Sequence, residues 1–140
     1  MTDRRTLFNE GIKLLTPFMK TSGFSFHFDG SGSSSGGQFA RGRFTRNDRT
    51  LELHFRVSLG LVTYRIGTAS LGHEHYMRLL GAGGRNRYPG FSDDPLQAFR
   101  DLEHDLRNFC TDFLTGSGEE FQMLAKEFES NPKMFSGLPD

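Results

Sequence analysis

The sequence predicts a single α+β domain over residues 1–140, in which a four-stranded antiparallel meander carries an N-terminal helix and C-terminal helices on one face. Three observations carry this prediction. From Leu51 to Leu59, apolar residues alternate with polar ones without a break, which is typical of a strand with one buried face. From about Thr6 to Lys20, and again after Asp94, apolar residues instead recur every three or four positions, as on one face of a helix.

The first amphipathic segment, Thr6–Lys20, is expected to be a helix that packs one face against the sheet. Pro17 has no amide hydrogen, so it should kink this helix or end it. The residues predicted to form the buried face are Phe8, Ile12, Leu15 and Met19.

Four strands follow, separated by turn residues. They are expected to cover Phe24–Phe28, Gln38–Arg46, Leu51–Leu59 and Val62–Ile66. Gly30–Gly37 contains only glycine and serine, which predicts a flexible hairpin connection that could be shortened with little loss of stability. Asn47-Asp48 and Gly60 are expected to reverse the chain on either side of the third strand. The inward-facing residues of the second strand would be Ala40, Gly42 and Phe44.

A short helix and a loop are expected after the strands. Ser70 can cap a helix that runs to about Leu80 and stops at Gly81. The following loop, Gly81–Gly90, is rich in glycine and arginine.

The last part of the chain is expected to form two helices with clear start signals. Asp94-Pro95-Leu96-Gln97 combines an N-cap, a proline at the first helical position and a capping-box partner, which predicts a long helix ending at Gly116. Ser117 and Glu120 form a second capping box, and Asn131-Pro132 would end the last helix. One core is predicted to contain Leu53, Phe55, Val57, Tyr64, Phe99, Leu102, Leu106 and Phe109.

The charges are balanced over the whole chain but divided along it. Residues 1–91 hold 13 lysines and arginines against 6 acidic residues, whereas residues 92–140 hold 4 against 11. This division predicts attraction between the strand and helix layers, or charges on opposite sides, and disfavours a nucleic-acid binder. The single Cys110 excludes an intrachain disulfide and is expected to be buried on a helix. No signal peptide or membrane span is expected, which favours a cytoplasmic protein.

The exposed face of the sheet is the best candidate for a binding surface. Strand parity places several arginines there, and guanidinium groups recognise carboxylates or phosphates through paired hydrogen bonds. The alternative is that these polar residues only solvate an open face. The open face would carry His27, Arg41, Arg43, Glu52, His54, Arg56, Thr63 and Arg65. A second candidate is the loop tip with Arg85 and Arg87, which could hold an anion.

Other polar motifs have a structural explanation. His73-Glu74-His75 could suggest a metal site, but residues two apart on a helix point to different sides, so a helix start with one packed and one solvated histidine is favoured. Asp93-Asp94 is explained by capping rather than by catalysis. Gly32–Gly37 lacks the lysine of a phosphate-binding loop. We therefore assign no catalytic residue and expect no metal and no cofactor.

One resemblance adds a functional expectation. Leu15–Met19 running into Gly23-Phe24, then Phe39–Arg46 and the alternating strand, and Tyr88–Phe91 ahead of Asp94-Pro95 resemble small bacterial proteins of unknown function. They are similar in layout to DUF4304-type and immunity-protein-like domains that accompany polymorphic toxins. The resemblance implies a cytoplasmic, non-enzymatic protein that binds another macromolecule, and it carries over no catalytic residue.

A second class of function stays open. A small enzyme or ligand-binding protein would need a pocket between the sheet edge and the helix that begins at Ser70. His54, His73 or His75 would have to converge there with arginines. The sequence favours a protein partner over a membrane or a nucleic acid and leaves the oligomeric state open.

Overall fold

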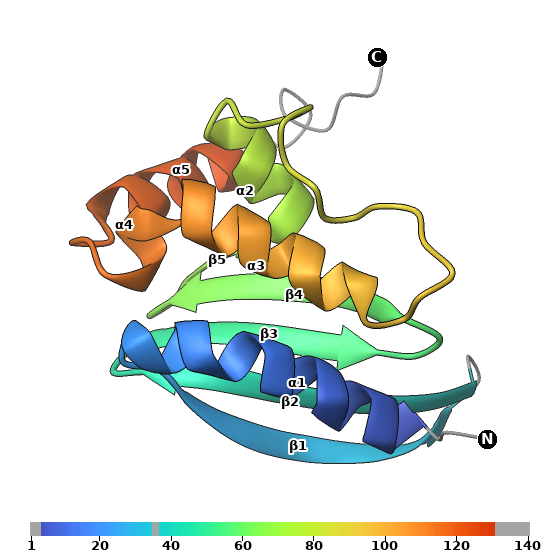
Figure 1. Cartoon of the computed structure of the whole chain (residues 1–140). Helices are drawn as coiled ribbons and strands as arrows, with labels where there is room; N and C mark the ends of the chain where they lie inside the picture. Colours follow the sequence, from blue (N-terminus) through green and yellow to red (C-terminus); the bar gives the residue numbers. More distant parts are fainter. Residues whose placement is uncertain (1–3, 35–36, 131–140) are drawn as a thin grey trace.

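The computed structural model describes residues 4–34 and 37–130 and contains one antiparallel sheet with helices packed against it. The sheet is a five-stranded meander in the order β1-β2-β3-β4-β5, which adds one strand to the predicted four (Figure 1). Within the described residues, no helix has the length and apolar character needed to cross a membrane. The elements are α1 (Arg4–Thr21), β1 (Ser25–Ser34), β2 (Gly37–Arg46), β3 (Arg49–Phe55), β4 (Leu59–Ile66), β5 (Ala69–Gly72), α2 (His73–Leu79), α3 (Gln97–Phe109), α4 (Thr111–Leu114) and α5 (Glu119–Ser130).

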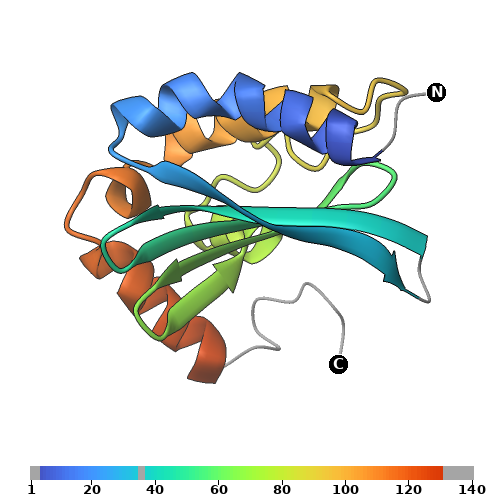
Figure 2. The same cartoon turned by 90° about the horizontal axis from the view of Figure 1, so that it is seen from below.

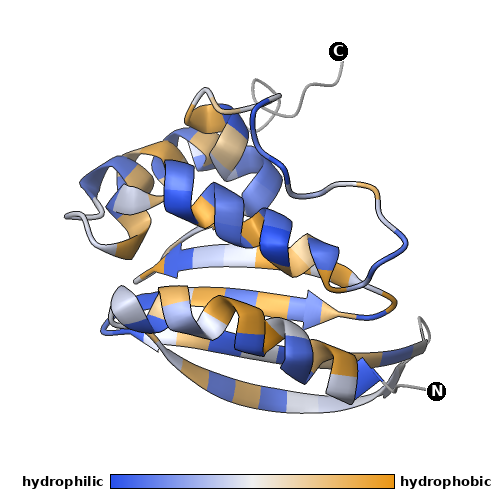
Figure 3. Cartoon of the chain, in the orientation of Figure 1, coloured by the Kyte–Doolittle hydropathy of each residue, from blue (hydrophilic) through white to orange (hydrophobic). Residues whose placement is uncertain are grey.

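The core lies between the sheet and the helix layer, in which α1 and α3 run side by side (Figures 1 and 2). The strands alternate as predicted, and Figure 3 shows hydrophobic and hydrophilic residues in turn along β1. Phe55, Tyr64 and Phe99 are fully buried, so the main part of the predicted core is confirmed. Phe109 lies at its margin. α1 approaches α3 so closely that a Cβ atom at Gly11 would lie 2.3 Å from the ring of Phe99.

The third strand is shorter than its alternating pattern predicted. β3 ends at Phe55, and the chain turns through residues 56–58, where the Arg56 amide bonds to the Ser58 carbonyl. Leu59 therefore belongs to β4, and Val57 is 77% exposed rather than part of the core. The prediction for Val57 was wrong because a hairpin tip can continue an apolar-polar alternation that belongs to two different strands.

The glycine–serine run is mostly strand, contrary to the predicted connection over residues 30–37. β1 continues to Ser34 and β2 begins at Gly37, so within this run only residues 35–36 lie outside the described structure. Backbone ladder bonds need no side chain, and the pairing partners are supplied by β2. The ring of Phe39 lies over Gly32, and a bulge between Phe28 and Gly30 shifts the register. A run of glycine and serine can therefore still form a strand when a neighbouring strand supplies the backbone hydrogen bonds.

The helix boundaries differ from the prediction in four places. Ser70 lies in the short strand β5, and α2 starts only at His73, because Ala69–Gly72 can pair with β4. Pro17 does not end the first helix, because it lies inside α1, which continues to Thr21. α3 starts at Gln97, after a turn in which the Asp94 carboxylate accepts the Leu96 amide.

The fourth difference is a break in the long helix that was predicted to end at Gly116. α3 stops at Phe109, and Cys110 separates it from α4. The Asp112 carboxylate then accepts the amides of Gly118 and Phe121, which caps α5. The expected stop at Asn131-Pro132 lies outside the described residues.

Two arginines of the β2–β3 turn connect the layers. Arg49 donates to the carbonyls of Asp112, Phe113 and Gly116, and Arg46 donates to the carbonyl of Leu114. These guanidiniums satisfy acceptors that the end of a helix leaves without partners. Part of the positive charge of the strand layer therefore stabilises helix ends rather than binding the acidic side chains of the helices.

Candidate functional site

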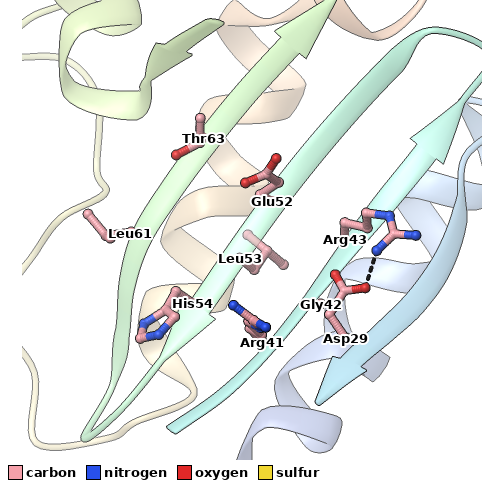
Figure 4. A pocket seen from close by; sticks show the side chains of 9 residues that line it. All are labelled: Asp29, Arg41, Gly42, Arg43, Glu52, Leu53, His54, Leu61 and Thr63. Atoms are coloured by element: carbon pink, nitrogen blue, oxygen red, sulfur yellow. Dashed lines mark hydrogen bonds and ion pairs between the residues drawn. The ribbon is translucent and has the colours of Figure 1, made fainter. Parts of the chain in front are cut away.

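The candidate site is the face of the sheet that points away from the helices. Figure 4 looks onto this face, with the helices behind the strands. Strand register aligns its side chains in rows, because Arg41 pairs with His54 and Arg43 pairs with Glu52 across β2 and β3. Glu52 in turn pairs with Thr63 on β4. The strand parity predicted from the sequence is correct for these residues.

Two of the four predicted arginines on this face are neutralised within the sheet. Arg43 forms an ion pair with Asp29 of β1, and Arg65 places its Nε 2.5 Å from a carboxylate oxygen of Glu52 on β3. Both ion pairs are partly exposed. They leave one half of the open face with little net charge.

The other half of the face carries a cluster of two arginines and two rings, which we call the cationic–aromatic cluster: Phe39, Arg41, His54 and Arg56. Phe39 and His54 stack with their ring centroids 5.5 Å apart and their planes 16° from parallel. The guanidinium carbons of Arg41 and Arg56 lie 5.9 and 5.8 Å from the centroid of Phe39. Both cations therefore approach the same ring.

Electrostatics at the cluster are dominated by positive charge. Burial first, and then the guanidiniums of Arg56 and Arg41, hold the pKa of His54 below its usual value. Within the described residues, no carboxylate forms an ion pair with Arg41. The exposed side chain of Leu61 lies on β4 beside His54 (Figure 4). This half of the face thus combines apolar surface with a cation, Arg41, that no carboxylate of the described residues pairs with.

A shallow hollow of about 460 Å³ joins the two halves of the face. The floor is backbone of β2 and β3 at Gly42 and Leu53, because both residues face the helix side of the sheet, where a Cβ atom at Gly42 would lie 2.4 Å from the ring of Phe26. Asp29 and Glu52 line one side, and Arg41 and His54 line the other (Figure 4). The hollow is open to solvent along the sheet, which suits a surface contact better than enclosure of a small molecule.

The predicted loop candidates, Arg85 and Arg87, do not join this site. Arg85 lies over the ring of Phe109 on α3 and donates to the Gly81 carbonyl. The backbone amide of Arg87 donates to Asp105, also on α3. Both residues lie on the helix side of the molecule, so the sequence-predicted site residues form two separate groups.

Sequence reasoning missed a buried polar network beneath this loop. Asp105 is fully buried on α3 and accepts four hydrogen bonds, from the rings of His73 and His104 and from the amides of Arg87 and Tyr88. The signal for it was present, because Asp105 occupies an apolar-face position between Leu102 and Leu106. A carboxylate at such a position is rarely buried unless it is fully hydrogen-bonded.

The network continues from His73 to the centre of the core. Because the Asp105 carboxylate only accepts, His73 donates from Nε2 at 2.9 Å, and its Nδ1 lies 2.7 Å from the Tyr64 hydroxyl. Cys110 donates to the same hydroxyl from 3.7 Å. Every hydrogen in this series of hydrogen bonds has an acceptor when the imidazole of His73 is neutral.

Burial sets the chemistry of these groups. It raises the pKa of Tyr64 well above the usual value and that of the Cys110 thiol to about 12. Burial on its own would also raise the pKa of Asp105, but the hydrogen bonds from His73, from the two backbone amides and from His104 lower it. Tyr64, His73, Asp105 and Cys110 are almost completely inaccessible, so the network has a structural role.

The three histidines that would have formed a pocket do not all meet, because only His73 and His75 line a common hollow. His54 lies on the open face, His73 has both ring nitrogens engaged in the core, and the ring of His75 packs against that of Phe128 of α5 with centroids 4.3 Å apart. His73 is therefore packed as expected, while His75 is half-buried rather than solvated. A hollow of about 280 Å³ at the free part of the β4 edge is lined by His73, His75 and Tyr88, without an arginine.

Comparisons of the chain with protein-family models, with curated proteins and with solved structures give no match.

Proposed function

We propose that this protein is a bacterial, cytoplasmic, non-enzymatic binding module of immunity type, which holds an acidic protein partner on the open face of its sheet. The observation that carries the proposal is the cationic–aromatic cluster, where Arg41 has no carboxylate partner among the described residues and two guanidiniums approach the same aromatic ring. Arginine and aromatic side chains on a rigid surface are the residue types that dominate protein interfaces.

The proposal ranks the predicted binding residues. Arg41, His54 and Arg56 would contact the partner directly, because they surround the same ring. Arg43 and Arg65 would contribute less, because a partner carboxylate would have to compete with Asp29 and Glu52. Arg85 and Arg87 lie on the opposite side and would not take part.

Exposed apolar side chains of the β3–β4 hairpin support a protein as the partner. Leu61 is 72% exposed and lies beside His54, and Val57 stands at the hairpin tip. Apolar side chains at the margin of a cationic surface favour a folded or extended polypeptide, which offers both carboxylates and apolar groups.

The test is a capture experiment with matched charge-reversal variants. The wild-type chain, the double variant Arg41→Glu/Arg56→Glu and the control Arg85→Glu/Arg87→Glu are immobilised and exposed to lysate of the source bacterium. We expect one acidic protein to be retained by the wild type and the control and lost from the cluster variant, with weaker retention at higher salt. Equal retention by all three proteins would remove the open face as the binding surface.

The immunity-type part of the proposal has its own readout. The captured protein should inhibit bacterial growth when it is expressed alone, and co-expression of the wild-type chain should restore growth. The Arg41→Glu/Arg56→Glu variant should fail to restore it while folding normally by circular dichroism. A captured protein without any effect on growth would contradict immunity function but leave the binding surface in place.

A further inference from the structure

We propose that the free edge of β1 at residues 30–34, which we call the edge segment, binds an extended acidic segment of a protein partner as an added strand. Arg4 and Arg5 in the first turn of α1 would bind the carboxylates of that strand. The inference goes beyond the proposed function, because it concerns the margin of the sheet and the start of α1 rather than the open face.

The edge segment has backbone groups that no neighbouring strand uses. β1 forms one margin of the sheet, and among the described residues its backbone pairs with β2 alone (Figure 1). Every second residue of such a strand directs its amide and carbonyl groups away from the sheet. Lysine and proline commonly block sheet edges, but β1 contains neither, and Ser31, Gly32 and Ser33 are exposed. The bulge between Phe28 and Gly30 limits this regular edge to the residues that follow it.

The register directs alternate positions of the edge segment to the two faces of the sheet. Ser31 pairs with Ala40, which is fully buried, so Ser31 and Ser33 face the helix side. Gly32 pairs with Phe39, whose ring covers Gly32 on the open face. An added strand would continue both rows, with every second side chain directed to the helix side.

The helix side of this edge carries two cations. Arg4, Arg5 and the edge segment line a common hollow of about 330 Å³. Neither arginine forms an ion pair with a carboxylate of the described residues. The guanidinium carbon of Arg5 lies 4.7 Å from the centroid of the Phe28 ring, and Arg4 donates to Gln38 at 3.4 Å. The buried Nε of Arg4 has no hydrogen-bond partner in the described part of the chain.

These charges favour an acidic strand over a second copy of this chain. Side chains that an added strand directs to the helix side would lie beside Arg4 and Arg5, where carboxylates accept charge-assisted hydrogen bonds. Two copies paired through the same edge would instead bring their arginines together, and like charges across an interface are unfavourable. Side chains on the other face would continue the row of Gly32 beside the ring of Phe39, which suits an apolar residue. The edge therefore fits a segment in which acidic and apolar residues alternate.

The experiment is a nuclear magnetic resonance titration of the full chain with two probe peptides, acetyl-Thr-Glu-Leu-Glu-Thr-amide and its neutral counterpart acetyl-Thr-Gln-Leu-Gln-Thr-amide. We expect the acidic peptide to shift the amide signals of Ser31, Gly32 and Ser33. It should bind about tenfold more tightly than the neutral peptide, and this ratio should fall as salt is raised. Equal affinities for the two peptides would overturn the choice of an acidic partner.

Two further peptides test strand pairing against charge attraction alone. The acidic peptide is N-methylated either at both glutamates or at its leucine and both threonines, which leaves its charge unchanged. Because only alternate amides of an added strand face the sheet, one peptide should bind about tenfold more weakly and the other should be affected much less. Similar affinities of the two N-methylated peptides, whether retained or lost, would overturn strand addition.

Variants of the protein test the two arginines. Arg4→Gln and Arg5→Gln should each weaken the acidic peptide about fivefold and leave the affinity of the neutral peptide within about twofold. The matched control Lys13→Gln removes an exposed cation from a later turn of α1 and should change both affinities less than about twofold. Circular dichroism checks that each variant folds. Equal losses for Arg5→Gln and Lys13→Gln would overturn the role of the arginines.

Failure of this inference can be distinguished from failure of the proposed function. Peptide-induced shifts confined to Arg41 and His54 would overturn strand addition and leave the open face as a binding surface. Self-association of the free chain through the edge segment would overturn the choice of partner. In the capture experiment, an Arg4→Glu/Arg5→Glu variant that loses the partner while the Arg41→Glu/Arg56→Glu variant retains it would support the edge and overturn the open face.

Discussion

Replacing Asp105 by asparagine tests the buried network most directly. Each carboxylate oxygen of Asp105 accepts two hydrogen bonds: Oδ2 from His73 and the Tyr88 amide, and Oδ1 from His104 and the Arg87 amide, at 2.7 to 2.9 Å. In Asp105→Asn one oxygen becomes an NH₂ group, which faces two donors in either orientation of the amide. Two hydrogen bonds to a charged acceptor are lost.

The expected cost is about 3 kcal/mol in the free energy of unfolding, because a lost hydrogen bond to a charged group costs about 1.5 kcal/mol or more. This is a large share of the roughly 5–15 kcal/mol that stabilises a typical domain. Urea denaturation at pH 7 followed by circular dichroism measures it. The control Asp93→Asn changes an exposed carboxylate and should alter the stability by less than about 0.5 kcal/mol.

The pH dependence adds a second check on the same prediction. The pKa of Asp105 is lower in the folded protein than in the unfolded chain, so its stabilisation is complete above about pH 4 and is lost as the pH falls through the folded value. The difference in stability between wild type and Asp105→Asn should therefore shrink below pH 4. A difference below 1 kcal/mol at pH 7, or one that stays constant down to pH 3, would refute the role assigned to this carboxylate.

Three further predictions concern the fold. Gly11→Ala should reduce stability by about 1–3 kcal/mol, since its Cβ would overlap the Phe99 ring, and Phe99→Leu in the same chain should recover part of the loss in urea denaturation. Arg49→Met should cost about 2 kcal/mol through three carbonyl groups left without their donor, and unchanged hydrogen exchange at the start of α5 would contradict this. Phe55→Ala should cost about 3–5 kcal/mol, whereas Val57→Ala should stay within about 0.5 kcal/mol; similar melting temperatures for the two variants would argue against the observed end of β3.

The layer arrangement could be predicted from the sequence because it depends on local periodicity. Phe44, Leu53 and Tyr64 face the helices as their alternation indicated, and the polar residues between them form the open face. The ends of the helices and strands were harder to predict from the sequence. β5 has only four residues, too few for a recognisable period, and its pairing with β4 is a tertiary contact that no local pattern reveals.

The residues of the candidate site could be predicted from the sequence, but the partners of each arginine could not. Parity placed Arg41 and Arg43 on one surface, but both look alike in the sequence. Only the register shows that Arg43 reaches Asp29 while Arg41 lies beside His54 and Phe39. Likewise, the hydrogen bonds of Asp105 come from residues far apart in the chain, so a sequence pattern can mark this buried acid without naming its donors.

The position of Cys110 gives the protein an internal reporter of its own opening. It is the sole cysteine of the chain, it is fully buried at the α3–α4 break, and its thiol stays protonated near neutral pH because its pKa is raised to about 12. A thiol-reactive dye can therefore modify it only in molecules in which the helices around the α3–α4 break have moved away from the sheet. The rate of labelling under native conditions would thus measure how often this part of the core opens, at a single atom and without introducing any mutation.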